Sequence, residues 1–191
     1  ENLKNENSYW LPDLSITYKN LNLNYYKSFS APNFYSIVSV NSDLYPTRIQ
    51  LASPFFDNTI EERYSIRYNK FFNKSKINFF ISANYSTKDN SVGYANTYNT
   101  ENSTGTSQSY QAGPTDSYGT NISFSKTFLQ NKNWNLSFST YSYVYANQNY
   151  SMSNNEENLA TQFYGNWNNT VTFSYKSGFT FTPSFAMGIN N

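Results

Sequence analysis

The chain has 191 residues, with 13 Lys and Arg against 12 Asp and Glu, and it contains no cysteine and no histidine. Without cysteine there can be no disulfide, thiolate metal site or Cys nucleophile, and without histidine the usual general base and the commonest metal ligand are missing. We therefore expect no enzyme activity, no cofactor and no metal site. The formal net charge is +1, and the basic residues are dispersed along the chain. We therefore expect no nucleic-acid partner.

The residue composition separates this chain from ordinary soluble domains. Aromatic residues make up 20% and charged residues only 13% of the chain, whereas soluble domains carry about 25% charged residues. No apolar run approaches the ~20 residues that a membrane helix needs. The polarity comes from Asn, Ser and Thr, which suits strands that have lipid on one face and a wet lumen on the other.

The first predicted hairpin has apolar and polar side chains alternating over residues 14–18 and 21–25, around a very short turn at Asn20. Ser30–Thr59 follows and contains Pro32, Pro46 and Pro54. Its length far exceeds the ~2 to 5 residues of a normal hairpin loop. We interpret it as a first outer loop.

The second predicted hairpin joins residues 64–68 to residues 77–85 through a turn at Asn73–Lys76. Arg63 and Arg67 fall on its polar face and are therefore candidates to face a lumen. They could steer an anionic solute, or they could pair with carboxylates on neighbouring strands. Ser86–Ser117 is rich in Asn, Thr, Ser, Gly and Tyr without an apolar period, which predicts a second outer loop.

A third hairpin is predicted from residues 118–124 to 134–138, and its second strand is expected to project beyond the bilayer near residues 141–145. After a predicted loop at Asn147–Asn158, a fourth hairpin joins residues 163–175 to Phe179–Asn190. The last segment shows the clearest alternation, because its large apolar side chains share one face and its small polar ones share the other. The fold class predicted is all-β, an antiparallel transmembrane β-barrel with about eight strands present.

Lysines lie close to aromatic residues at every predicted short turn. They are Lys19, Lys70, Lys74, Lys76, Lys126, Lys132 and Lys176. Aromatic girdles with long basic side chains reaching for water are typical of a membrane interface.

The order of short turns and long loops predicts that residues 1–191 form one partial barrel domain. The long loops separate the four hairpins, which puts both ends of the chain on the long-loop side. A complete bacterial barrel normally has both ends on the short-turn side, so we expect either a piece of a larger barrel or a count that is wrong by one strand at each end.

Two sets of loop residues are candidates for binding. Five tyrosines could contact a ligand or a partner through their ring faces: Tyr35, Tyr45, Tyr94, Tyr98 and Tyr110. Four acidic residues could offer oxygen ligands to calcium: Asp43, Asp57, Glu61 and Glu62. The spacing of these acids fits no EF-hand loop, which favours plain solvated charge.

The stretch Leu11–Tyr68 resembles the C-terminal barrel of Bacteroidetes TonB-dependent outer-membrane receptors. Tyr25–Ser28 with Pro32 matches the Tyr-x-x-Ser and nearby Pro of that family, and Asp43–Pro46 matches its Asp-x-x-Pro-like step. Residues 52–56 occupy the positions of Gly-Asn-Pro-x-Leu. Ala52 and Ser53 replace the Gly and Asn there, and residues 58 and 59 are Asn and Thr where the family has Pro and Glu.

The resemblance implies a barrel of about 22 strands in the bacterial outer membrane. Such a barrel normally follows a plug domain and a TonB-contacting segment, and neither is visible in residues 1–191. It would import a bulky nutrient such as an oligosaccharide, a peptide or a siderophore. The implied partners are outer-membrane lipid, TonB through an N-terminal region, and a surface lipoprotein or other subunits of an outer-membrane complex.

Three alternatives stay open at this point. The barrel could be a structural or scaffolding subunit of an outer-membrane complex. It could be a small independent barrel of about eight strands. It could also be a soluble β-sandwich, which would bury the apolar face of residues 179–189 in a core.

Overall fold

The computed structural model describes residues 8–32, 40–41, 48–51, 53, 56–101, 104–153, 156–176 and 178–191. These residues form strands and connecting turns, and no helix in this part of the chain is long and apolar enough to cross a membrane. The strands are β1 (Asp13–Tyr18), β2 (Leu21–Ser30), β3 (Val40–Asn41), β4 (Arg48–Leu51), β5 (Thr59–Phe72), β6 (Ile77–Asp89), β7 (Val92–Asn99), β8 (Thr104–Gln111), β9 (Thr115–Gln130), β10 (Trp134–Ser153), β11 (Glu156–Tyr175), β12 (Phe179–Phe181) and β13 (Ser184–Asn190).

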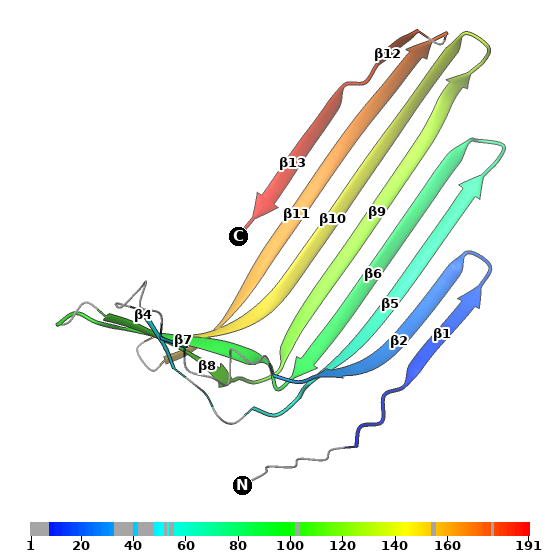
Figure 1. Ribbon diagram of the computed structural model, residues 1–191. Helices are drawn as coiled ribbons and strands as arrows, with labels where there is room; N and C mark the ends of the chain where they lie inside the picture. The colour runs from blue at the N-terminus through cyan, green and yellow to red at the C-terminus, as the bar shows by residue number, and fades with distance from the viewer. Residues whose placement is uncertain are drawn as a thin grey trace.

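The long strands form one antiparallel sheet in the order β1-β2-β5-β6-β9-β10-β11, with β12 and β13 both on β11 (Figure 1). The four predicted hairpins are therefore confirmed. β12 and β13 together make the last predicted strand, and their register on β11 is the same on both sides of Pro183. Pro183 interrupts the ladder because it has no N–H, which an edge strand tolerates.

The sheet is open in the part of the chain that the structure describes. There β1 pairs only with β2, and β12 and β13 pair only with β11. Each edge strand consequently presents a row of backbone N–H and C=O groups that no neighbouring strand uses.

The predicted outer loops contain strands, which corrects the loop assignments. β7 and β8 form a hairpin within Ser86–Ser117, and β10 and β11 stay paired through most of the predicted loop at Asn147–Asn158. β7 pairs parallel to the end of β10, and β4 pairs parallel to β8, so these short strands extend the sheet at its loop end (Figure 1). β7 and β8 lack apolar alternation, and the pairing of their backbones defines them.

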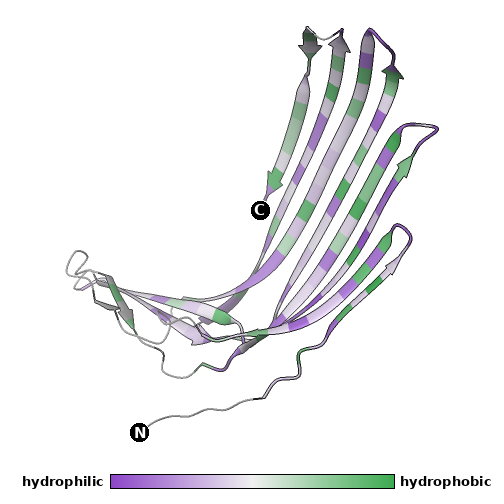
Figure 2. Cartoon of the chain, turned by 45° about the vertical axis from the view of Figure 1, so that its right-hand side comes forward, coloured by the Kyte–Doolittle hydropathy of each residue, from purple (hydrophilic) through white to green (hydrophobic). Residues whose placement is uncertain are grey.

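The strand registers sort the side chains onto two faces. The apolar face includes cross-strand rows such as Leu23, Ile66 and Ala83, or Ile81 and Ile122. It continues to Phe185, Met187 and Ile189 on β13. The polar face carries the intervening Asn, Ser and Thr side chains, and the two kinds alternate along the long strands in Figure 2.

The sheet is a single layer without a conventional core. The accessible surface of the whole chain is 13933 Å², whereas a folded soluble monomer of this mass has about 9,300 Å². Ala112 is the one buried hydrophobic residue in the described part of the chain, and Phe185 is 62% exposed. The sandwich alternative predicted that residues 179–189 would be buried, and within the described chain nothing covers them.

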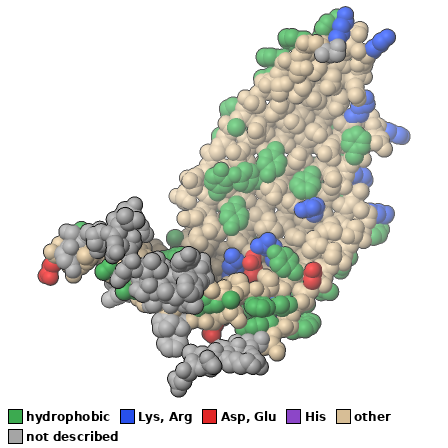
Figure 3. Space-filling model, viewed as in Figure 1, with side chains coloured by type: hydrophobic (Ala, Val, Ile, Leu, Met, Phe, Trp, Pro, Cys, Tyr) green, Lys and Arg blue, Asp and Glu red, His purple; other side chains and the backbone are tan. Residues whose placement is uncertain are grey.

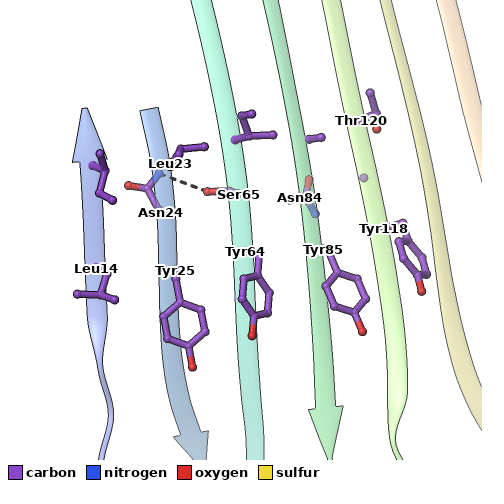
Figure 4. A pocket seen from close by; sticks show the side chains of 14 residues that line it. Leu14, Leu23, Asn24, Tyr25, Tyr64, Ser65, Asn84, Tyr85, Tyr118 and Thr120 are labelled. Atoms are coloured by element: carbon purple, nitrogen blue, oxygen red, sulfur yellow. Dashed lines mark hydrogen bonds between the residues drawn. The ribbon is translucent and has the colours of Figure 1, made fainter. Parts of the chain in front are cut away.

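Charged residues lie near both ends of the apolar face. At the loop end, four tyrosine side chains lie side by side across β2, β5, β6 and β9 (Figure 4). They are Tyr25, Tyr64, Tyr85 and Tyr118. The next row on the same face contains an ion pair between Lys27 and Glu62. We call Tyr25, Tyr64, Tyr85 and Tyr118 the tyrosine row.

At the short-turn end, four lysine ammonium groups lie over neighbouring aromatic rings, at 4.9 to 5.1 Å from the ring centroids. The pairs are Lys19 with Tyr18, Lys70 with Phe72, Lys126 with Phe128, and Lys176 with Tyr175. Lysine also occupies the left-handed position of three turns, with φ of 50 to 52° at Lys19, Lys76 and Lys176. The predicted clustering of lysine and aromatic residues at the short turns is confirmed.

Candidate functional site

Neutral amides and hydroxyls dominate the polar face, which is the side turned toward the viewer in Figure 3. Asn24 Nδ2 donates to Ser65 Oγ at 3.3 Å, and Asn121 Nδ2 donates to Ser82 Oγ at 3.3 Å. The Tyr141 hydroxyl donates to Asn121 Oδ1 at 3.1 Å. Such a face is wettable along its whole length, which suits contact with water or a polar solute.

Arg63 and Arg67 lie on this face, as predicted. Arg63 Nη2 lies 2.7 Å from Glu61 Oε1, on its own strand rather than on a neighbour, and its guanidinium lies 5.4 Å from the Tyr26 ring centroid. Arg67 lies 6.0 Å from the Phe80 centroid and forms no ion pair among the described residues. Arg67 is therefore the freer of the two cations.

The polar face ends in a pocket of about 300 Å³ at the loop end of the sheet. We call it the polar pocket. Its lining is dominated by hydroxyl and amide groups and includes one lysine. The lining residues are Ser30, Thr59, Lys88, Ser91, Val92, Thr115, Asp116, Ser117, Tyr145, Asn147, Gln148, Asn149 and Tyr150.

The corner between β6 and β7 forms one wall of the polar pocket. Asn90 adopts a left-handed conformation with φ of 55°, which turns the chain across the end of the sheet. The Thr59 hydroxyl donates to the Asn90 carbonyl at 2.9 Å, and the buried Ser91 hydroxyl donates to the Gly113 carbonyl at 2.6 Å. These bonds fix the corner to β5 and to the segment before β9, so the wall is held from two sides.

The structure separates the candidate tyrosines. Tyr94 and Tyr98 lie on one face of the β7–β8 hairpin and are exposed, which fits contact with a ligand or a partner. Tyr110 lies opposite Gly93, and its hydroxyl is buried with no hydrogen-bond partner among the described residues. Tyr110 therefore packs within the hairpin, and its role as a contact residue stays a prediction. Tyr35 and Tyr45 lie outside the described residues.

Gly93 is required by the position of the Tyr110 ring. A Cβ at residue 93 would lie 2.5 to 2.8 Å from three atoms of that ring, including its hydroxyl oxygen. Burial raises the pKa of Tyr110 above its usual value, and the negative charge of Glu157 adds to the shift. Tyr110 and Gly93 thus pack as a pair that holds β7 against β8.

The acidic residues bind cations and amides of the chain itself. Gln111 Nε2 donates to Asp57 Oδ2 at 3.4 Å, Glu61 pairs with Arg63, and Glu62 pairs with Lys27. In the described part of the chain no group of three Asp or Glu side chains could hold a metal ion. Asp43 lies outside the described residues.

The apolar face carries a shallow groove of about 570 Å³ beside the tyrosine row. Aliphatic side chains such as Leu14, Leu23 and Ile66 line the groove (Figure 4). Ala83 and Thr120 also line it, and their small side chains leave room for the hollow. Its shape and chemistry match an acyl chain better than a polar solute.

The polar pocket is not apparent from the sequence. Its lining comes from strands β2, β5, β6, β9 and β10, together with Ser91 and with Val92 at the start of β7. The only available signal was the density of Ser, Thr and Asn near the strand ends, which is also typical of loops.

No protein-family model, curated protein or solved structure matches this chain. The comparisons therefore add no relative from which a site could be transferred.

Proposed function

We propose that this chain is part of an outer-membrane β-barrel of the receptor or transporter kind, which imports a bulky nutrient such as an oligosaccharide, a peptide or a siderophore. The observation that carries the proposal is the single-layer sheet, whose apolar face lies open between a tyrosine row and a set of lysine–aromatic pairs. Water disfavours such a face, whereas the hydrocarbon core of a bilayer covers it without cost.

The height of the apolar face fits a bilayer. Along β6, Tyr85 and Ile77 are separated by eight residue steps, roughly 27 Å at about 3.4 Å per residue. With the strand tilt of about 40° found in barrels, this spans about 20 Å along the membrane normal, close to the apolar band of about 25 Å. The aromatic and charged rows then lie at the two interfaces.

The open edges support a barrel that includes further strands. Unpaired backbone groups cost several kcal/mol each in hydrocarbon, so a sheet inside a membrane closes on itself or on more strands. A closed barrel of about 22 strands is the expectation that the resemblance supplies.

The polar face would then line the lumen, with Arg63 and Arg67 exposed to the solute. The loop-end strands would capture the nutrient, and the lumen would pass it after a plug yields. No bond is made or broken in this mechanism. TonB, acting through a plug-bearing N-terminal region, and a surface lipoprotein are the proposed protein partners.

Scaffolding in an outer-membrane complex is the second candidate. Tyr94 and Tyr98 favour it, because both are exposed on the same face of the β7–β8 hairpin at the loop end. Aromatic residues of this kind are enriched in protein interfaces. A scaffold would copurify with a stable protein partner and transport no solute, whereas an uptake receptor would transport a solute.

Extraction of the native protein from outer membranes in detergent tests the proposal, with its intact mass as the readout. A membrane-bound species of several times 22.1 kDa supports a large barrel. A species near 22.1 kDa contradicts a large barrel, and recovery in the soluble fraction contradicts membrane insertion altogether.

A further inference from the structure

The polar pocket is built for a ligand with many hydroxyl groups. Side chains that both donate and accept hydrogen bonds line it, from Ser30, Thr59 and Thr115 on one side to Asn147 and Asn149 on the other. Amides and hydroxyls can match either polarity of a ligand hydroxyl. A lining of this type favours a ligand whose own groups also donate and accept, as sugar hydroxyls do.

The volume of the pocket and the side chain of Tyr145 favour a ligand that consists of a single ring. A volume of about 300 Å³ is at the lower end of the range for small-molecule sites, about 300 to 1,000 Å³. Tyr145 lines the pocket and is 40% exposed, so part of its ring remains available. An aromatic surface can cover the apolar C–H side of a sugar while the polar lining binds its hydroxyls.

Lys88 gives the pocket a positive charge that the neighbouring carboxylates do not neutralise. Glu61 lies opposite Lys88 in the β5–β6 register, but its Oε1 lies 2.7 Å from Arg63. Asp116 also lines the pocket and keeps its negative charge, but the β6–β9 register places it on the opposite face of the sheet from Lys88, where its Oδ1 accepts a hydrogen bond from the Tyr85 hydroxyl at 2.8 Å. Lys88 is exposed and makes no ion pair among the described residues, so a ligand carboxylate can approach it.

We propose that the polar pocket binds an acidic sugar, a hydroxyl-rich ring that carries a carboxylate, with Lys88 facing the carboxylate. The proposal rests on the proposed function, because it places the site at the loop end of the lumen-lining face. It goes beyond that function by naming the ligand chemistry and the residue that selects it.

Calorimetric titration of the full chain in detergent tests the proposal with three probes: D-glucuronate, D-glucose and acetate. We expect glucuronate to bind about two- to fivefold more tightly than glucose, the range for an ion pair in contact with water. Acetate should bind far more weakly than either, because it lacks the hydroxyls. The preference for glucuronate should shrink as salt is added.

Two variants assign the preference to this pocket. Lys88→Gln should lower the affinity for glucuronate to that for glucose and leave glucose binding unchanged. Asn147→Asp should weaken glucuronate more than glucose, because it adds a carboxylate to the same lining. Lys132→Gln is the matched control, since Lys132 is an exposed lysine at the opposite end of the sheet.

Equal binding of glucuronate and glucose, no binding of either, acetate as tight as glucuronate, or a preference that survives Lys88→Gln would each overturn the proposal. The proposed membrane function is tested separately, by the lipid exposure of β6. If the pocket shows no Lys88-dependent preference for glucuronate while alternate residues of β6 still face lipid, the ligand proposal alone is refuted.

Discussion

Lys27 Nζ lies 2.8 Å from Glu62 Oε1, on the cross-strand pair that follows Tyr25 and Tyr64 on the apolar face. The Tyr64 hydroxyl also donates to Glu62, at 3.0 Å. The pair is the first charged row beyond the tyrosine row, and the next row on that face is Phe29 with Ile60. In the proposed membrane barrel, the loop-side boundary of the bilayer would lie between the tyrosine row and the Lys27–Glu62 row.

The Lys27–Glu62 pair predicts a loss of stability in acid. The hydrogen bond from Lys27, followed by that from Tyr64, lowers the pKa of Glu62 below its usual 4.5. A lowered pKa means that the folded state binds the proton less well, so the stabilisation is present above pH 4.5 and lost as the pH falls through the folded pKa. Thermal melts in detergent should show a falling midpoint there in the wild type.

Glu62→Gln isolates this effect, since it cannot titrate. We expect the variant to melt slightly lower than the wild type at pH 7 and to lose less on acidification through the same window. The effect is small because the pair is in contact with water. Parallel melting curves for the two proteins from pH 7 to pH 3 would show that Glu62 is not the group responsible.

Gly93→Ala should destabilise the β7–β8 hairpin by roughly 1 to 3 kcal/mol, the usual cost of overpacking. The added Cβ would lie 2.5 Å from the Tyr110 ring. Hydrogen exchange of residues 92–111 in detergent measures the change locally. Gly165→Ala is the matched control, because the nearest atom to its Cβ lies at 3.8 Å. Equal exchange in both variants would contradict the packing that we describe.

Tyr110→Phe should leave the hairpin as stable as the wild type or make it more stable. The Tyr110 hydroxyl is buried and has no hydrogen-bond partner within the described part of the chain, so its removal also removes a desolvation cost of about 1 to 3 kcal/mol. Hydrogen exchange of β8 is again the readout. Faster exchange in the variant would mean that the hydroxyl makes a stabilising contact.

The same residue predicts a loss of stability in alkali. Burial raises the pKa of Tyr110 above 10.0, so its contribution is complete below that pH and is lost as the pH rises through the folded pKa. The wild type should therefore lose hairpin protection at strongly alkaline pH, and Tyr110→Phe should lose less. Identical alkaline profiles would assign the loss to other groups.

Ile81→Arg should impair insertion into vesicles, whereas Ser82→Arg should not. Ile81 lies on the apolar face and Ser82 on the polar face of the same strand. A charge on the lipid face costs about 2 to 4 kcal/mol at the bilayer midplane, and a charge in a lumen does not. The fraction that is folded and protected from protease in vesicles measures the difference. Equal yields would argue against lipid contact at Ile81.

The hairpins could be predicted from the sequence because one face of each strand is apolar and imposes a period of two residues. Ile81 and Ser82 alternate for this reason, and so do Phe185 and Ala186 with their neighbours. The same signal placed Arg63 and Arg67 on the polar face. It failed for β7 and β8, because their two faces carry similar polar residues and only backbone pairing defines them.

The polar pocket could not be predicted from spacing along the chain. Ser30, Lys88 and Asn147 meet there only because β2, β5, β6, β9 and β10 end at the same side of the sheet. Tyr94 and Tyr110 differ in exposure because the β7–β8 register places them on opposite faces of the hairpin. That register depends on a turn whose length the composition does not reveal.

Spin labelling of β6 in lipid vesicles tests the central claim most directly, and the absence of native cysteine makes single-cysteine variants from residue 77 to residue 85 straightforward. We predict that labels at Ile77, Phe79, Ile81 and Ala83 are accessible to oxygen and shielded from a water-soluble nickel chelate, and that the intervening positions show the reverse. Accessibility without alternation, or oxygen maxima at the intervening positions, would contradict a sheet whose apolar face lies in the membrane.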